Sequence, residues 1–190
     1  MHRFFADERG IVENIAYLNA EDAGHALRVL RLENGDEVEL VCAPARYLAE
    51  IDSTEGGEVR LRVTGKLRDT EAQTRVTLYQ GLPKADKMEW IVQKSTELGA
   101  AAIAPVAMIR SVVKLDGKDA AKKTERWQKI AREAVKQCAR VNAPEVKMPR
   151  KLAAMKDELN ALDVLIVPWE EARDGSIADC LAPFKAKERV

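Results

Sequence analysis

From residue 75 onward, short apolar runs alternate with stretches whose apolar residues recur with the period of a helix. The runs at 76–80, 101–106 and 163–168 each predict a strand buried on both faces. Between these runs, the apolar spacing predicts helices over 86–98 and 121–140. Shorter helices are predicted near 151–159 and 176–182. Strand–helix alternation is typical of a parallel sheet with helices on both faces, so we expect an α/β domain.

The first 70 residues have a different pattern. Three runs alternate apolar and polar residues and follow turn sequences, which predicts short strands at 37–41, 47–51 and 59–63. Asn19, followed by two acidic residues, is typical of a capped helix start. We therefore expect a small barrel-like β domain over 1–70 and the α/β domain over 75–190, joined by a polar linker at 66–74.

Charge is distributed unevenly along a chain whose net charge is zero. Residues 1–70 carry 9 Lys and Arg against 14 Asp and Glu, whereas residues 110–151 carry 13 against 5. A local excess of this size can attract phosphate groups even on a neutral protein. The basic region indicates either a nucleic-acid surface or a solvated helix face with scattered lysines.

Several functional classes are disfavoured by composition. No run of about 18 apolar residues predicts a membrane span, and the N-terminus does not resemble a secretory signal. The three cysteines show no paired spacing and the two histidines are too few for a typical zinc site, so we expect no metal. These features fit a reducing cytoplasm.

Two candidate anion-binding segments follow predicted strands. L-P-K-A-D-K at 82–87 places Lys84 and Lys87 beside a helix start, and Asp86 with Glu89 predicts a capping box. Arg110 follows the next strand and can bind a phosphate or a carboxylate. The alternatives are a solvated loop for the first segment and a surface ion pair for the second.

A polar stripe lies opposite the apolar face of the predicted 121–140 helix. Its members are Arg126, Lys129, Glu133, Gln137 and Arg140. Three of them are positive and four can donate hydrogen bonds, which suits RNA, although an ordinary wet helix face has the same composition.

In the first domain, Arg28 and Arg31 lie one turn apart and can meet a backbone phosphate. Phe4 and Phe5, which follow Arg3, are interpreted as core residues, and His25 as structural. The sequence offers no nucleophile–base or paired-carboxylate arrangement.

Read in order, these segments resemble the 16S rRNA (uracil-N3) methyltransferase family of the SPOUT superfamily. The matching stretches are R-F-F at 3–5, H-A-L-R-V-L-R at 25–31, N-G-D at 34–36, L-P-K-A-D-K-M-E-W-I-V-Q-K-S-T-E-L-G at 82–99, I-R-S-V-V-K at 109–114 and E-R-W-Q-K-I-A-R-E-A-V-K-Q-C-A-R at 125–140. The likeness covers essentially the whole chain, and the two long stretches in this order are highly specific.

The resemblance implies a PUA-like β-barrel that grips rRNA, followed by a SPOUT α/β domain whose C-terminal end forms a trefoil knot. It implies a homodimer that transfers a methyl group from S-adenosylmethionine to N3 of one uridine in 16S rRNA, on the 30S subunit. Arg110 is then the candidate catalytic residue, because a cation near O2 or O4 stabilises the N3 anion. The candidate rRNA-binding residues are Arg3, Arg28, Arg31, Lys84, Lys87, Arg126, Gln137 and Arg140.

One departure from the family pattern affects the cofactor. The family's glycine-rich G-P-E-G-G turn and its L-G-x-x-I-L-R-x-E-T-A stretch are not found in these 190 residues. We therefore expect an incomplete SPOUT domain without its knot, no measurable S-adenosylmethionine binding and no activity. The alternative is a non-enzymatic rRNA-binding or ribosome-assembly module, and a SPOUT methyltransferase acting on tRNA fits the N-terminal segments less well.

Overall fold

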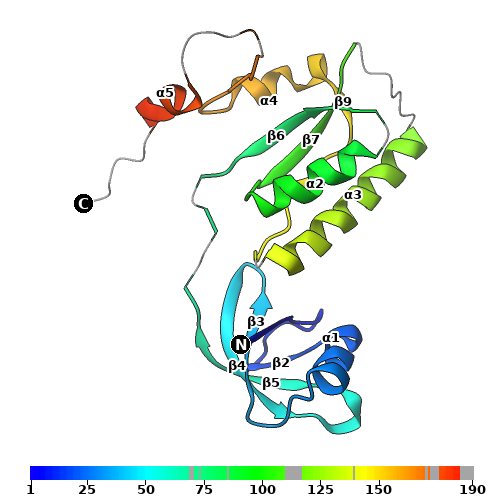
Figure 1. Cartoon of the computed structure of the whole chain (residues 1–190), viewed down its shortest axis with the longest axis vertical. Helices are drawn as coiled ribbons and strands as arrows, with labels where there is room; N and C mark the ends of the chain where they lie inside the picture. Colours follow the sequence, from blue (N-terminus) through cyan, green and yellow to red (C-terminus); the bar gives the residue numbers. More distant parts are fainter. Residues whose placement is uncertain are drawn as a thin grey trace. The chain divides into compact units, whose positions relative to one another are not determined.

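A computed structural model describes residues 1–190 except 69–70, 73, 85, 110–116, 139, 170, 172–175 and 185–190. The chain forms two compact units, Met1–Pro149 and Arg150–Val190. The first unit contains two separate sheets, one formed before the linker and one after it (Figure 1). Among the described helices, none combines the length and the apolar composition that a membrane span requires.

The first sheet has five strands in the order β1-β3-β4-β5-β2. They are β1 (His2–Phe5), β2 (Ile15–Tyr17), β3 (Glu37–Cys42), β4 (Ala45–Ser53) and β5 (Arg60–Lys66). β1 runs parallel to β3, and the other neighbours are antiparallel. The sheet curls because Ala6, just after β1, forms an antiparallel bridge with Leu18, just after β2. This bridge brings the two edge strands together.

Apolar side chains on the inner side of this sheet form the first core. Phe4, Leu40, Ile51 and Leu61 are at most 3% exposed, which confirms the prediction for Phe4 and the period-2 patterns of the later strands. Each such side chain contributes roughly 1.5–3 kcal/mol of burial free energy. Helix α1 (Ala20–Gly24) begins as predicted, with the Asn19 side chain accepting from the Asp22 N–H at 2.9 Å, and continues into a π-helical turn, η1 (His25–Val29).

The second sheet places β7 (Ala102–Ala107) between β6 (Thr77–Gly81) and β8 (Glu145–Val146), all parallel. Helices α2 (Lys87–Glu97) and α3 (Gly117–Cys138) pack against each other and share one core with this sheet (Figure 1). That core consists of Leu82, Met88, Val92, Ala100, Ile103, Trp127, Ala131 and Val146. The parallel sheet and both amphipathic helices are therefore confirmed within Met1–Pro149.

One helix start differs from its prediction. The Asp86 side chain makes no capping hydrogen bond at the start of α2, and Glu89 instead forms an ion pair with Arg126 at 2.8 Å. The predicted capping box at this helix is wrong because the arginine on α3 offers Glu89 a charged partner in place of the backbone N–H.

The second unit holds short elements: β9 (Arg150–Lys151), η3 (Leu152–Met155), α4 (Lys156–Asn160), α5 (Ile177–Leu181) and η4 (Ala182–Phe184). The predicted helix near 176–182 is confirmed, and Ser176 forms a capping box with Asp179. The predicted strand at 163–168 is wrong, because the described residues there are not in a strand. Leu165 is 50% exposed and Val167 is 75% exposed, so this apolar run lacks the neighbouring strand that its pattern requires.

Candidate nucleic-acid interface

The carboxyl ends of β6 and β7 bring two predicted segments together. The Leu82 N–H donates to the Val106 carbonyl at 2.9 Å, which extends the strand pairing to the end of β6. A Cβ atom added to Gly81 would lie 3.4 Å from Met108 Cγ, so the two chain segments approach closely just beyond the strands. Lys84 follows on the surface, and Ile109 is fully exposed. Ligands of open α/β sheets bind at such an edge.

Arg110, the predicted catalytic residue, lies outside the described residues, as do 111–116. The described residues Met108 and Ile109 follow β7 directly. Lys84 and Lys87 are both exposed, at the end of β6 and the start of α2. The prediction that the 82–87 segment lies between a strand and a helix is confirmed by β6 and α2.

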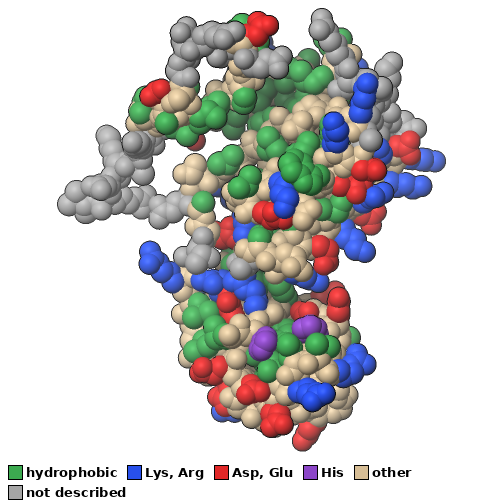
Figure 2. All heavy atoms as spheres, in the orientation of Figure 1, with side chains coloured by type: hydrophobic (Ala, Val, Ile, Leu, Met, Phe, Trp, Pro, Cys, Tyr) green, Lys and Arg blue, Asp and Glu red, His purple; other side chains and the backbone are tan. Residues whose placement is uncertain are grey.

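The polar stripe predicted on the long helix is confirmed for the four residues that lie on α3, Arg126, Lys129, Glu133 and Gln137, but not for Arg140. Helix α3 ends at Cys138, so Arg140 lies beyond it rather than on its surface. Arg126 forms the ion pair with Glu89 of α2, whereas Lys129 and Gln137 are exposed. Figure 2 shows basic side chains along the right-hand edge, where α3 runs in Figure 1, with acidic side chains between them.

Arg140 holds together three segments that are distant in the sequence. Its Nη1 donates to the carbonyls of Thr96 at 3.0 Å and Ala100 at 2.9 Å, at the end of α2. Its Nη2 and Nε donate to one carboxylate oxygen of Glu71 at 2.7 and 3.2 Å. Its side chain is only 13% exposed. The Arg140 guanidinium therefore has a structural role here.

Glu71 completes this cluster from the linker. Its other carboxylate oxygen accepts from the Val141 and Asn142 N–H groups at 2.8 and 3.2 Å. Burial alone would raise the pKa of the Glu71 carboxyl, but hydrogen bonds from Arg140 and these two N–H groups outweigh it, so the pKa is lowered. The sequence analysis missed Glu71 because the linker shows no pattern, and its partner lies about 70 residues away.

Arg3 is likewise engaged in ion pairing. It pairs with Glu39 on β3, and Arg46 donates to the same carboxylate oxygen at 2.9 Å. Burial raises the pKa of Glu39, but hydrogen bonds from the two arginines outweigh this effect and lower it. Arg3 Nη1 also donates to the Arg140 carbonyl at 3.5 Å, so two predicted RNA-binding residues are neighbours.

The remaining predicted residues of the first domain, Arg28 and Arg31, are exposed around the end of η1. Arg28 Nε donates weakly to the Gly24 carbonyl at 3.5 Å, and Arg31 has a positive φ of 55°. A groove that the sequence analysis missed lies elsewhere on this sheet, where the Arg9 guanidinium stacks 3.7 Å from the centre of the Tyr17 ring and Arg60 completes the lining. No group of His, Cys, Asp or Glu side chains among the described residues could hold a metal ion.

Comparison with known proteins identifies the family. The model of an RNA methyltransferase domain matches residues 70–189. The ribosomal RNA small subunit methyltransferase E of Bacillus subtilis is 37% identical over 165 residues, covering 85% of this chain and 64% of the relative. Its counterpart in Aquifex aeolicus is 30% identical over 159 residues, covering 83% of this chain and 67% of the relative. The chain thus spans slightly less than two thirds of the Bacillus protein.

Solved structures give the same relationship. A ribosomal RNA small subunit methyltransferase E from Neisseria gonorrhoeae, bound to S-adenosyl methionine, is 30% identical with a TM-score of 0.64, covering 85% of this chain and 66% of that one. A crystal structure described only as a hypothetical protein is 33% identical with a TM-score of 0.74, covering 89% of this chain and 71% of that one. From these matches, the chain belongs to the RNA methyltransferase family that includes the small subunit methyltransferases E.

Proposed function

We propose that this protein methylates N3 of one uridine in 16S rRNA, on the 30S subunit, with S-adenosylmethionine as the methyl donor. The observation that carries this proposal is the match of the RNA methyltransferase model to residues 70–189. The Bacillus and Aquifex relatives are named for modification of small-subunit rRNA, and the Neisseria relative binds this donor. The choice of N3 rests on the family resemblance in the long helical stretches.

We further propose that residues 1–70 act as a PUA-like rRNA-binding barrel and that residues 75–190 belong to a SPOUT domain of a homodimer. The curled five-stranded sheet and its Ala6–Leu18 bridge support the first assignment. The parallel order β6-β7-β8, with α2 and α3 on the sheet, supports the second. A homodimer is tested by sedimentation equilibrium, where a monomeric mass at assay concentration would contradict it.

The described residues at the β6–β7 edge do not by themselves fit S-adenosylmethionine. They are mainly apolar, and the exposed charges between β6 and α2 are those of Lys84, Asp86 and Lys87, which together carry a net charge of +1 that does not favour a sulfonium. The glycine-rich family segment, whose backbone would approach the ligand, is not found in the 190 residues. We therefore expect these residues alone to bind the donor too weakly for calorimetry and to be inactive.

Donor binding separates the two candidate functions, a methyltransferase and a non-enzymatic rRNA-binding module. Titration calorimetry with S-adenosylmethionine, beside a binding assay with 30S particles, distinguishes an enzyme from a non-enzymatic rRNA-binding module. Micromolar donor affinity of the 190 residues would contradict the expectation of weak binding. A longer form that carries the family's glycine-rich segment should bind the donor, and failure of that form to bind it would favour the binding module.

The rRNA contacts are proposed at exposed cations. Lys84 and Lys87 lie at the sheet edge, and Arg28 and Arg31 lie on the first domain, where each can meet a phosphate. Gln137 is exposed near the end of α3. Of the other predicted contacts, Arg126 would have to exchange its Glu89 partner for RNA, and Arg3 and Arg140 support the site through their ion pairs.

We assign Arg110 to stabilisation of the uracil anion. Uracil N3 carries a proton that must leave, and a guanidinium near O2 or O4 favours the anion in a site shielded from water. In the product of the whole gene, Arg110→Ala should lower the single-turnover methylation rate on 30S particles at least about tenfold. Arg62→Ala, an exposed arginine paired with Asp52 on the first sheet, is the control and should leave the rate unchanged. A near-normal rate for Arg110→Ala would exclude this role.

A further inference from the structure

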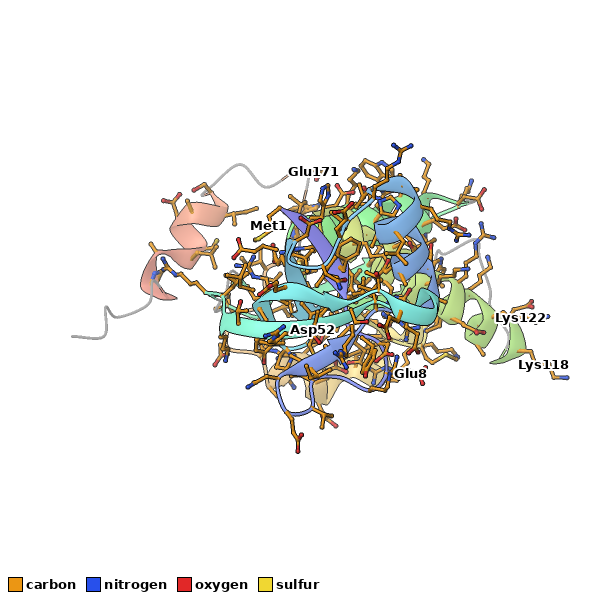
Figure 3. The ribbon with its side chains drawn as sticks, turned by 90° about the horizontal axis from the view of Figure 1, so that it is seen from below. Met1, Glu8, Asp52, Lys118, Lys122 and Glu171 are labelled. Carbon is orange, nitrogen blue, oxygen red and sulfur yellow. The ribbon has the colours of Figure 1, made fainter. Side chains whose placement is uncertain are left out.

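Helix α3 carries a line of basic side chains on the face opposite its core. Its buried residues include Ala134 as well as Trp127 and Ala131, which belong to the core shared with the sheet and α2. The α3 ridge, as we define it, consists of four exposed cations: Lys118, Lys122, Lys129 and Arg132. Their spacing of i, i+4, i+11 and i+14 keeps them on one side of the helix over about 21 Å. Figure 3 shows Lys118 and Lys122 projecting away from the rest of the molecule.

These four charges lack acidic partners within the described part of the chain. Other cations on α3 are already paired: Arg126 with Glu89, and Lys136 with Glu133 at 3.5 Å and Glu21 at 4.0 Å. None of the four ridge residues forms an ion pair or a hydrogen bond with a described residue. Glu125 lies on the same side of the helix, so the ridge and this carboxylate together carry a net charge of +3.

The spacing of the ridge cations lowers the stability of α3 when no anion lies along it. Lys118 and Lys122, and likewise Lys129 and Arg132, are neighbours one turn apart, where like charges repel each other. A helix that serves only to cover the sheet gains nothing from this arrangement. An anionic partner that lies along the helix would remove the repulsion and gain the attraction of all four charges.

The ridge chemistry suits a phosphate backbone. Long, flexible lysine side chains without aromatic neighbours in the line suit phosphate oxygens rather than stacked bases. We propose that the α3 ridge binds the phosphate backbone of the rRNA substrate and fixes its register, while residues at the β6–β7 edge act on the target base. This assignment rests on the proposed rRNA substrate. The ridge differs from the polar stripe predicted from sequence, with which it shares only Lys129.

The salt dependence of RNA binding tests this proposal directly. The ridge variant replaces Lys118, Lys122 and Lys129 by glutamine. The matched control replaces three exposed lysines outside α3 by glutamine, namely Lys66, Lys151 and Lys156. The two variants have the same net charge. Glutamine and lysine have similar helix propensities, and relief of the repulsion between exposed neighbours is worth only about 0.2 to 0.5 kcal/mol per pair, so the ridge variant should stay close to the wild-type melting temperature. The whole-gene product is titrated with 16S rRNA and with 30S particles.

Each lost phosphate contact lowers the magnitude of the slope of log affinity against log salt by about 0.7 to 0.9. Between about 50 and about 200 mM salt, the loss of affinity of the ridge variant should therefore be smaller than that of the wild type by a factor of about 20 to 40. The control should match the wild type. A wild-type slope for the ridge variant would overturn the proposal, and so would a slope change on 30S particles but not on free rRNA, which would identify a ribosomal protein as the partner. Absence of wild-type binding to either target would instead overturn the proposed function.

Discussion

Glu71→Gln should cost about 2 to 4 kcal/mol of unfolding free energy. The glutamine keeps one carbonyl oxygen for the Val141 and Asn142 N–H groups but turns an amide NH₂ toward the Arg140 guanidinium. The variant therefore loses two charge-assisted hydrogen bonds and leaves a mostly buried cation without its carboxylate. Removing one partner of a fully buried pair costs about 3 to 5 kcal/mol. The estimate is lower because the two side chains are 13% and 16% exposed.

Urea unfolding followed by tryptophan fluorescence measures this loss, because Trp90 and Trp169 are already exposed in the folded protein and the emission change comes mainly from Trp127. Trp127 is 4% exposed in the core beneath α3, so its emission reports on the unit that contains Glu71. Glu97→Gln is the matched control, because Glu97 pairs with Lys94 on the surface of α2, where an ion pair contributes little to stability. A loss as small as that of the control would refute the structural role of Glu71.

A double-mutant cycle separates the pair from its surroundings. Arg140→Met removes the guanidinium, and in that background Glu71→Gln should cost at least about 1 kcal/mol less than in the wild type. Additive effects of the two substitutions would show that the carboxylate and the guanidinium do not interact.

The pH dependence gives a second test. The pKa of Glu71 is lowered in the folded protein, so its contribution is present above the carboxyl's unfolded pKa and is lost as the pH falls through the folded one. The difference in unfolding free energy between the wild type and Glu71→Gln should be largest near neutral pH. This difference should shrink below the ordinary carboxyl range of about pH 4. A difference that is the same at acidic and neutral pH would contradict the ion-pair explanation.

Two further substitutions test the packing and the backbone. Trp127→Ala should lower the unfolding free energy by about 3 to 5 kcal/mol in urea titrations followed by circular dichroism, because it empties the core between α3 and the sheet. Thr96→Val should cost less than about 1.5 kcal/mol in the same assay, because the shape of this buried side chain is kept and only the 2.8 Å bond to the Val92 carbonyl is lost. Glu13 and Asn14 both have positive φ, a conformation that glycine adopts readily and alanine does not. Glu13→Gly should therefore raise the melting temperature and Asn14→Ala should lower it, and each should change the free energy of unfolding by up to about 1 kcal/mol. Equal effects of Trp127→Ala and Thr96→Val, or a lower melting temperature for Glu13→Gly, would contradict these assignments.

The regular elements with one strongly apolar face were predictable from sequence. Strands β3, β4 and β5 and helices α2 and α3 were found within a few residues of their predicted ranges, because each buries one side against a core. The short edge strands β1 and β2 were not predicted. Three or four residues are too few to show a period, and β1 pairs in parallel with β3, more than 30 residues away.

The site was harder to predict because its charges are paired over long distances. Arg140 fits the helical phase of α3, yet the helix ends at Cys138, and the guanidinium turns to Glu71, Thr96 and Ala100 instead. The sequence pattern predicted a polar face correctly but did not indicate which cations find carboxylates. Only the three-dimensional structure shows that Arg126 and Arg140 form ion pairs, whereas the α3 ridge lysines form none with a described residue.

This separation leads to opposite expectations for two sets of residues on neighbouring parts of the molecule. Arg140 follows α3 and attaches the end of that helix to α2 and to the linker, so Glu71→Gln should lower stability while the salt dependence of RNA binding stays at its wild-type slope. The α3 ridge lysines touch no described partner, so their substitution should change the slope and leave the melting temperature unchanged. Both measurements on both variants therefore distinguish residues that build the surface from residues that bind RNA. If either substitution changed both quantities, the division between structural arginines and RNA-binding lysines would be wrong.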